Sequence, residues 1–310
     1  MGIGDVWQIE TGTCTDLYAV DVGMYGVSEY ASVYVIDDER PAIVETGLGN
    51  NPALVLDALE AVGIDREDLS VIALTHVHLD HAGGANQLAE ACPNATVVVY
   101  ERGAPHLADP AALVAGTKQV VGDLWKYYHG PDPIPDDRIR TVTDGDTVDL
   151  GDHVLDVYHA PGHANHQVLF DDPANDAVFV GDAVGSYFPG LDAVRQITPP
   201  PEFDFQQNLD DLNLLRELDR ETLLFSHFGA HPARGKLDAY ESVLASWVAG
   251  IAQARQAAGS DKAVLKQMLE QNVTPDNWHE DLRFGETRTN VSGVLTYLDI
   301  VDEVPLALAR

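Results

Sequence analysis

The sequence predicts an α/β protein with a helical C-terminal extension. Short β-rich runs alternate with helical stretches and turn signals up to about residue 235, which is the pattern of layered α/β folds. After that point the apolar residues recur at helical spacing and the β-rich runs stop. We therefore expect one domain over residues 1–235 and a helical extension over residues 236–310.

The predicted elements of the first domain follow the chain in order. A helix is predicted over residues 51–64, because apolar residues recur there at helical spacing and a glycine lies near the end. Strands are predicted from β-rich runs at residues 30–37, 41–47, 70–76, 95–101, 154–163, 176–182 and 221–227. The last three runs each lead into a His or an Asp, which indicates a site along the rim of a sheet.

Residues 102–140 interrupt this alternation with a helical run and a loop rich in proline and aspartate. This helical insertion is either a lid over a site or a surface helix with its loop, and the pattern does not choose between them. Further along, helices are predicted at residues 237–256, 261–272 and 291–301. The extension that they form either covers the pocket or provides the surface of a homodimer.

The chain is strongly acidic, with 50 Asp and Glu against 18 Lys and Arg and a formal net charge of −32. The acids are spread along the chain, which indicates a solvated surface, and 45% hydrophobic residues exclude disorder as the cause. Such a surface repels phosphate backbones, so we expect no nucleic-acid partner. Concentrated salt screens this self-repulsion, because the Debye length falls to about 3 Å at 1 M, and we infer a halophilic source.

Targeting signals are not apparent in the sequence. No apolar run reaches the roughly 18 residues that a membrane helix needs, and the start MGIGDVWQIE lacks the basic and apolar regions of a signal peptide. We therefore expect a cytoplasmic protein with no membrane partner. Cys14 and Cys92 fit neither a disulfide framework nor a zinc-knuckle spacing, and both are expected to be buried small apolar residues.

The strongest chemical signal is the run HVHLDH, which follows the strand VIALT and offers His76, His78, Asp80 and His81. Alternation at the end of a strand sends the first two His the same way, and a tight turn brings the other two residues beside them. The glycines after this run permit a close approach of the backbone before the next helix. A cluster of four metal-ligating side chains in six residues rarely arises by chance.

Three later strands end in the same manner, at His163, Asp182 and His227. Each alone is a weak signal, because a single His or Asp after a strand is often a cap or a surface group. Together with the first cluster they make seven candidate ligands. Imidazole-rich positions suit one borderline ion and the rest suit a second, with a carboxylate able to bridge two ions about 3.5–4 Å apart.

The chain resembles the metallo-β-lactamase fold hydrolases over roughly residues 15 to 235, in the order and separation of these ligands. The resemblance is closest to the glyoxalase II-like and lactonase-like branches, and it implies an αββα sandwich. It implies a first metal ion on His76, His78 and His163. A second ion is implied on Asp80, His81 and His227, with Asp182 bridging the two. The expected ions are zinc, with iron or manganese as alternatives.

Glu45 stands where this family has an Asp at the end of its first motif strand. By resemblance, the carboxylate orients the ligands, and a capping or turn role is the alternative. Tyr187 and Phe188, shortly after Asp182, are expected either to line the mouth of the pocket or simply to pack. His166 is not expected to bind metal, and the remaining His are expected on the surface or in packing positions: His106, His129, His153, His159, His231 and His279.

The resemblance and the ligand set together predict a hydrolase that uses metal-bound hydroxide. Asp80 is the expected catalytic residue, because it is placed to orient the nucleophile or to pass a proton. The expected substrates are small molecules with a thioester, ester or lactone carbonyl, and β-lactams belong to one small branch of the family. Glutathione as the thiol carrier is unsupported, because no basic motif in the C-terminal part maps onto the family's.

Two other activities of the same fold are weighed against this hydrolase. An oxidoreductase that acts on persulfides with a single iron is the main alternative, and the complete second ligand set argues against it. A nuclease or phosphodiesterase is disfavoured by the acidic charge. A module that binds metal without catalysis is disfavoured by the complete set of ligands.

Overall fold

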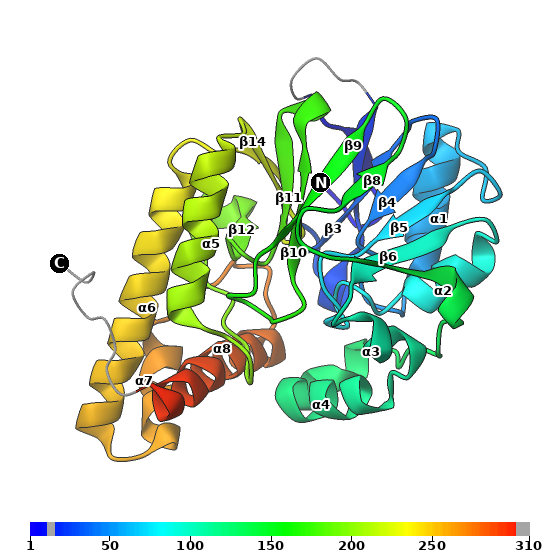
Figure 1. Ribbon diagram of the computed structural model, residues 1–310. Helices are drawn as coiled ribbons and strands as arrows, with labels where there is room; N and C mark the ends of the chain where they lie inside the picture. The colour runs from blue at the N-terminus through cyan, green and yellow to red at the C-terminus, as the bar shows by residue number, and fades with distance from the viewer. Residues whose placement is uncertain (11–15, 302–310) are drawn as a thin grey trace.

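The computed structural model describes residues 1–10 and 16–301 of the chain. Two sheets face each other at the centre of the molecule (Figure 1). In the described residues the first sheet has its strands in spatial order β1 to β7, antiparallel up to β4 and parallel from there on. These strands are Val6–Gln8, Leu17–Asp21, Ser32–Ile36, Ala42–Val44, Val71–Ala73, Thr96–Tyr100 and Ile139–Val142.

The second sheet is mixed and has the order β15-β14-β11-β10-β9-β8. Only the β11–β14 pair in this order is parallel. A separate two-stranded hairpin joins β12 (Ser186–Phe188) to β13 (Ala193–Arg195). From β8 onward the strands of the sheet are Thr147–Asp149, Val154–His159, Val168–Asp172, Ala177–Gly181, Thr222–Phe225 and Gly229–Pro232.

A dry core holds the two sheets together, and β3 shows how the sequence builds it. Val33 and Val35 join the core that faces the outer helices, whereas Tyr34 and Ile36 join the core between the sheets. Side chains alternate across a strand, so an apolar run such as SVYVI is buried on both faces. The Tyr34 hydroxyl also donates to the carbonyl of Phe225 on the other sheet, at 2.6 Å.

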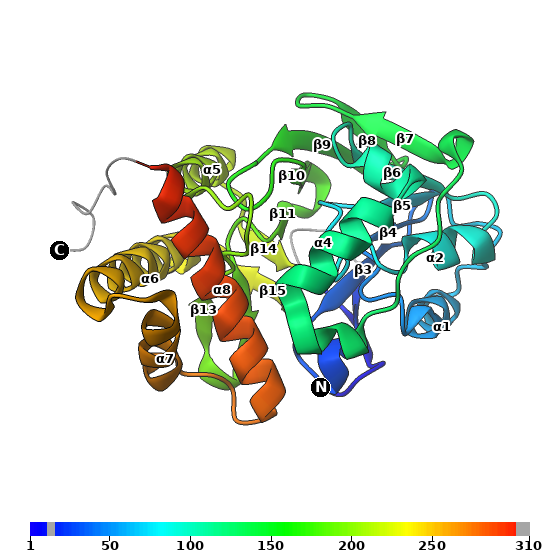
Figure 2. The same cartoon turned by 90° about the horizontal axis from the view of Figure 1, so that it is seen from below.

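Helices cover the outer face of each sheet (Figures 1 and 2). α1 (Pro52–Val62) and α2 (Ala85–Ala91) pack on the first sheet, and α5 (Phe205–Leu218) and α6 (Lys236–Ala258) pack on the second. The αββα sandwich expected from the sequence is therefore confirmed. α1 also lies where it was expected, starting at a proline and ending before Gly63, whose φ is 87°.

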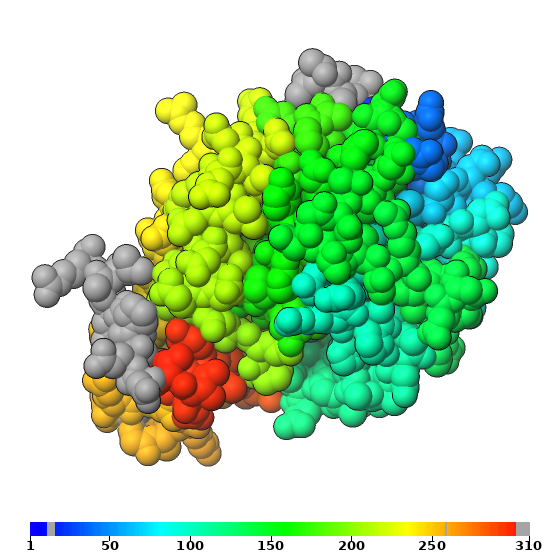
Figure 3. Space-filling model, viewed as in Figure 1, coloured from blue at the N-terminus to red at the C-terminus, as the bar shows by residue number. Residues whose placement is uncertain are grey.

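The insertion and the C-terminal helices α7 and α8 lie at the same, lower side of the molecule in Figures 1 and 3. α7 (Asp261–Gln271) lies close to its prediction, while α8 (Glu280–Ile300) begins well before the expected residue 291. α6 and α8 share one core with the second sheet, and the division of the chain at residue 235 stays a prediction. Between β6 and β7 the helical elements are Ala104–Ala108 (α3), Ala111–Val121 (α4), Gly122–Tyr127 (η2) and Asp136–Arg138 (η3).

Two smaller expectations concern cysteines and membranes. Cys92 is buried, as expected, and Cys14 lies outside the described residues. Across the part of the chain that the structure describes, no helix combines the length and the apolar character that crossing a bilayer requires.

Candidate metal centre

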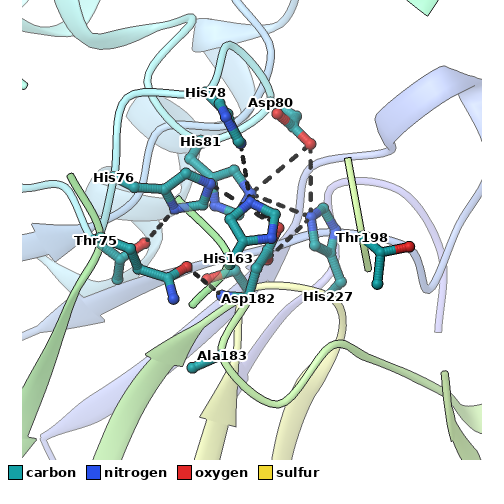
Figure 4. A network of polar contacts seen from close by, with 12 residues as sticks. Thr75, His76, His78, Asp80, His81, His163, Asp182, Ala183, Thr198 and His227 are labelled. Atoms are coloured by element: carbon teal, nitrogen blue, oxygen red, sulfur yellow. Dashed lines mark hydrogen bonds and ion pairs between the residues drawn. The ribbon is translucent and has the colours of Figure 1, made fainter. Parts of the chain in front are cut away.

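The seven candidate ligands meet at one edge of the sandwich (Figure 4). The loop of residues 74–84 carries four of them and follows the carboxyl end of β5 in the first sheet. His163, Asp182 and His227 follow β9, β11 and β14 of the second sheet. These three strands run in one direction, because β9 and β11 are each antiparallel to β10 and β11 is parallel to β14. Both sheets therefore contribute ligands to the same edge.

The first group consists of His76, His78 and His163, whose ligand atoms lie within 4.8 Å of one another. Nε2 of His163 is 3.0 Å from Nδ1 of His78. His76 is fully buried, and its Nδ1 lies 3.1 Å from the Thr75 hydroxyl, which leaves Nε2 free to face the group. The structure thus brings together the three residues that were expected to hold the first ion.

The second group consists of Asp80, His81 and His227, again within 4.8 Å. The Nε2 atoms of the two His are 3.3 Å apart. Oδ2 of Asp80 lies 3.8 Å from Nε2 of His81 and 3.7 Å from Nε2 of His227. His227 donates from Nδ1 to the carbonyl of Tyr30 at 3.1 Å, an interaction that sets its ring orientation.

Asp182 lies between the two groups. Its Oδ2 is 3.4 Å from Nε2 of His163 and 3.4 Å from Nε2 of His81, so one oxygen faces both groups. Its Oδ1 is 3.6 Å from Nε2 of His227. This is the position that a bridging carboxylate needs.

The donor set fits divalent ions by two tests. Ligand atoms bound at 2.0–2.1 Å in a tetrahedron lie about 3.3–3.4 Å apart. The closest contacts here run from 3.0 to 3.9 Å, and all atoms of each group lie within 4.8 Å of one another. Nε2 of His76 and Oδ1 of Asp182 are buried without a hydrogen-bond partner. Buried polar atoms without partners are costly unless a cation or a water satisfies them, so the site is built to hold metal ions.

Burial and mutual proximity shift the pKa values of these side chains. Burial, reinforced by the neighbouring imidazoles, lowers the pKa of His76 and His78 well below its ordinary value. Both rings are therefore neutral, and each has a nitrogen lone pair available for a metal ion. At His81 burial opposes the charge, but Asp182, Glu45 and Asp80 raise the pKa well above its ordinary value. At Asp182, likewise, the surrounding His outweigh burial and hold the pKa far below the usual range.

Glu45 is buried behind the second group. Its Oε1 accepts from Nδ1 of His81 at 3.2 Å, from the Ser226 hydroxyl at 2.9 Å and from the Thr75 hydroxyl. A carboxylate oxygen of Glu45 also lies within 4.8 Å of ligand atoms of His76 and His81. Oε1 already accepts three hydrogen bonds and so orients His81, while Oε2 is buried without a hydrogen-bond partner.

Several supporting residues were not predicted from the sequence. The Gln167 side chain accepts from the backbone N–H of Asp182 at 3.0 Å and donates to the carbonyl of Ala160 at 3.2 Å. Asp211, on α5, accepts from the backbone N–H of Gly162 at 2.7 Å and so holds the loop that carries His163. Burial raises the pKa of Asp211 to about 6. These contacts connect elements far apart in sequence, so they could not be predicted from it. Of the supporting residues, only those next to a ligand in the chain, such as Thr75, could have been suspected.

A cavity of about 340 Å³ opens onto the ligands, within the usual range for small-molecule sites. The insertion and α8 both line it, and the walls are mainly apolar, with Leu113, Leu124 and Trp278 among them. His106 lines the cavity as well, from a half-buried position. His166 also lines it.

Of the two aromatic residues expected at the pocket mouth, one is placed there and one is not. Phe188 lines the cavity. Tyr187 does not: its ring packs against His231 at 3.7 Å between centroids, and its hydroxyl donates to Asp192 at 2.5 Å. Neighbouring residues of β12 point to opposite faces, so Tyr187 takes the packing position that was the alternative to lining the pocket mouth.

The fold and the site define a class of protein: an αββα sandwich with a His- and Asp-rich metal centre at one edge. A family model described as the metallo-beta-lactamase superfamily matches residues 27–227. The chain belongs to the metallo-β-lactamase superfamily. The fold, the class of site and the family expected from the sequence thus agree.

Comparisons with individual proteins agree with this assignment. The metallo-beta-lactamase fold-containing protein ST1585 of Sulfurisphaera tokodaii is 30% identical over 223 residues, or 70% of this chain and 79% of that protein. The crystal structure of ST1585 superposes with a TM-score of 0.69 at 25% identity, covering 91% of this chain and 99% of that one. Human acyl-coenzyme A thioesterase MBLAC2 is 26% identical over 199 residues, or 57% of this chain and 67% of that protein.

A more distant relative is the hydroxyacylglutathione hydrolase of Erythrobacter litoralis. It is 30% identical over 151 residues, which are 49% of this chain and 45% of that protein. These relatives support a metal-dependent hydrolase in general.

Proposed function

We propose that the protein is a hydrolase with two divalent ions, zinc in the first instance, that cleaves a thioester, ester or lactone bond. The observation that carries this proposal is the second ligand group, Asp80, His81 and His227, complete beside the first and sharing Asp182 with it. The likeness to an acyl-coenzyme A thioesterase and a hydroxyacylglutathione hydrolase supports acyl transfer to water.

Each group of residues at the site would have its own role in such a reaction. Ions held there would lower the pKa of bound water and polarise a carbonyl oxygen. Asp80 lines the cavity with its side chain 22% exposed, so its carboxylate can orient an incoming water and accept its proton. Glu45 fixes the ring of His81 from behind. The apolar walls hold the acyl part and exclude bulk water.

The surroundings in which the protein works are proposed from its charge. A net charge of −32 favours a halophilic, cytoplasmic setting, in which concentrated salt screens self-repulsion. The partner is then a small-molecule substrate rather than a nucleic acid or a membrane, and a homodimer through the C-terminal helices is the proposed alternative to a monomer. Unfolding at 0.1 M and 3 M KCl tests the setting: stability that does not rise with salt contradicts it.

Metal analysis combined with a substrate screen tests the proposed activity. We expect two equivalents of zinc per chain and turnover of thioesters, esters or lactones in buffer of high salt. His78→Ala should lose metal and turnover, while His129→Ala, at an exposed position outside the ligand set, should keep both. One iron per chain with oxygen uptake, or activity on phosphodiesters alone, would contradict the proposal.

A further inference from the structure

Arg195 is a cation on the wall of the cavity that has no partner in the described structure. It ends β13 and pairs across the hairpin with Ser186 of β12. Residues paired across two antiparallel strands point to the same face, so Arg195 lies on the face that carries Ser186 and Phe188. All three line the cavity. The side chain is half-buried, and its Nε is fully buried without a hydrogen-bond partner.

This lack of a partner is unusual for a chain with 50 acidic residues. Other half-buried arginines find acceptors: Arg216 binds Glu241 at 2.6 Å, Arg220 binds Asp171 at 2.6 Å, and Arg138 donates to the carbonyl of Ala95 at 2.6 Å. Among the residues that the structure describes, Arg195 is the one cation with a buried, unsatisfied nitrogen. Leaving a buried donor unpaired is costly, so a group that binds there would offset the cost.

The charges on the cavity wall indicate what that group is. Arg195 is the sole Lys or Arg among the described lining residues, whereas the acids there include Asp80 and Asp182 of the metal centre. A third acid, Glu202, is engaged by the backbone N–H of Asn165 at 3.2 Å and by its side chain. A guanidinium with a planar fork of donors and no carboxylate of its own is matched to an anion.

We propose that Arg195 binds a carboxylate of the substrate and so determines its specificity. The inference rests on the proposed acyl hydrolysis. Ser186, its partner across the hairpin, lies four residues after the candidate bridging ligand Asp182, so the carboxylate binds on the same wall as the metal centre. A single guanidinium neutralises one anionic group, which favours a monocarboxylate over a carrier with several phosphates. The apolar wall formed by α4 and Trp278 takes the rest of the molecule.

A matched pair of substrates tests this assignment. The S-hexanoyl thioester of 3-mercaptopropionate carries the carboxylate, and that of 3-mercaptopropionamide is its neutral counterpart. We expect Arg195→Gln to lower kcat/KM for the carboxylate roughly 10- to 150-fold, the range for hydrogen bonds to charged groups, and to leave the amide nearly unchanged. Arg195→Lys should recover part of the loss, because it keeps the charge without the fork. Arg234→Gln, at an exposed position, is the control.

Other outcomes overturn the assignment. Equal loss on both substrates means a structural role, and no loss on either means that Arg195 does not contact the substrate. S-Hexanoyl pantetheine and its phosphorylated form provide a second comparison. If Arg195→Gln lowers kcat/KM only for the phosphorylated substrate, the anion that Arg195 binds is not a carboxylate. If the wild-type protein hydrolyses no thioester, the proposed function fails separately. Calorimetric binding of the thioether S-hexyl-3-mercaptopropionate, against its amide, then still tests Arg195 in wild-type protein and Arg195→Gln.

Discussion

Replacing Glu45 with Gln tests whether a buried carboxylate orients the second ligand group. Oε1 of Glu45 accepts three hydrogen bonds, from His81, Ser226 and Thr75. A hydrogen bond to a charged group contributes about 1.5–3 kcal/mol, and a neutral one about 1 kcal/mol. Gln keeps an acceptor oxygen of the same reach and loses the charge, so each contact weakens by about 1 kcal/mol.

The part of this loss that falls on His81 should appear as weaker metal binding. Outer contacts to a metal-ligating His typically alter affinity about 10- to 100-fold, and we expect that loss at Asp80, His81 and His227. The group of His76, His78 and His163 should change much less, because the hydrogen bonds described here link it to Glu45 only indirectly, through the Thr75 hydroxyl.

Competition with a chromophoric chelator resolves the two binding steps. Glu60→Gln, exposed on α1, controls for the loss of one surface charge. Glu45→Asp keeps the charge and shortens the reach, at a backbone position with φ 71°, and should fall between wild type and Glu45→Gln. Two unchanged affinities, or an equal weakening of both steps, would refute the orienting role.

Three further predictions concern stability and metal content. Hydrogen bonds to Asp172 and Asp16 raise the pKa of buried His153 to about 9. The protonated imidazole therefore stabilises the folded protein fully below pH 6.5, and this contribution is lost as the pH rises through 9. In urea unfolding, the wild-type free energy of unfolding should fall by about 3 kcal/mol across this window, and that of His153→Gln should fall little. Gly162→Ala would place Cβ 2.3 Å from a backbone atom of α5 and should lower both the melting temperature and the metal content. Gly250→Ala on α6 would place Cβ in ordinary contact with the Met268 methyl at 4.0 Å and should stabilise by about 0.5–1 kcal/mol. Chelation should lower the melting temperature and abolish hydrolysis, and added zinc should restore both. Ions present at 100 times their Kd stabilise the folded protein by about 2.7 kcal/mol. An unchanged melting temperature after complete removal of the metal would contradict this prediction.

The fold was predictable where burial imposes a simple pattern. β3 and β6 are apolar after their first residues, Ser32 and Thr96, because both faces are covered there, and they were predicted close to their true ends. The short strand β1 (Val6–Gln8) is only partly buried and was not predicted. α5 was also missed, although it buries Leu209, Leu212 and Leu215, because acidic and amide residues separate these leucines. The helical spacing of apolar residues is difficult to recognise when many acidic surface residues stand between them.

The early start of α8 has a similar cause. Its first half is mostly polar and buries Gly285, which lies against Leu124, while Gly293 in the second half lies against the carbonyl of Thr198. A glycine within a helix is about 1 kcal/mol less favourable than an alanine, which makes the helix harder to recognise from the sequence. Here the missing side chain allows close packing, so tertiary contact overrides the low helical propensity.

The candidate site divides in the same way. The ligands were visible because HVHLDH is contiguous and the other three each follow a strand. The residues that position them, such as Gln167 and Asp211, act across 15 and 49 residues of sequence. Arg195 could not be singled out at all, because its interest lies in the partner that it lacks, which only three-dimensional structure reveals.

The charge of the cavity reconciles an anionic substrate with a surface that repels anions. Asp80, Asp182, Glu202 and Glu286 face the cavity with Arg195, so by formal charge the metal-free wall is negative. Burial, together with the charge of Asp80, raises the pKa of Glu286 to about 8, which leaves this carboxyl largely neutral at pH 7. The two divalent ions of the proposed site would more than neutralise the remaining carboxylates. With them the cavity would be a local positive site within a protein of net charge −32, able to hold one carboxylate against Arg195. The proposed metal site and the proposed anion site would thereby be coupled, because the charge of the ions would offset the repulsion that otherwise excludes an anionic substrate.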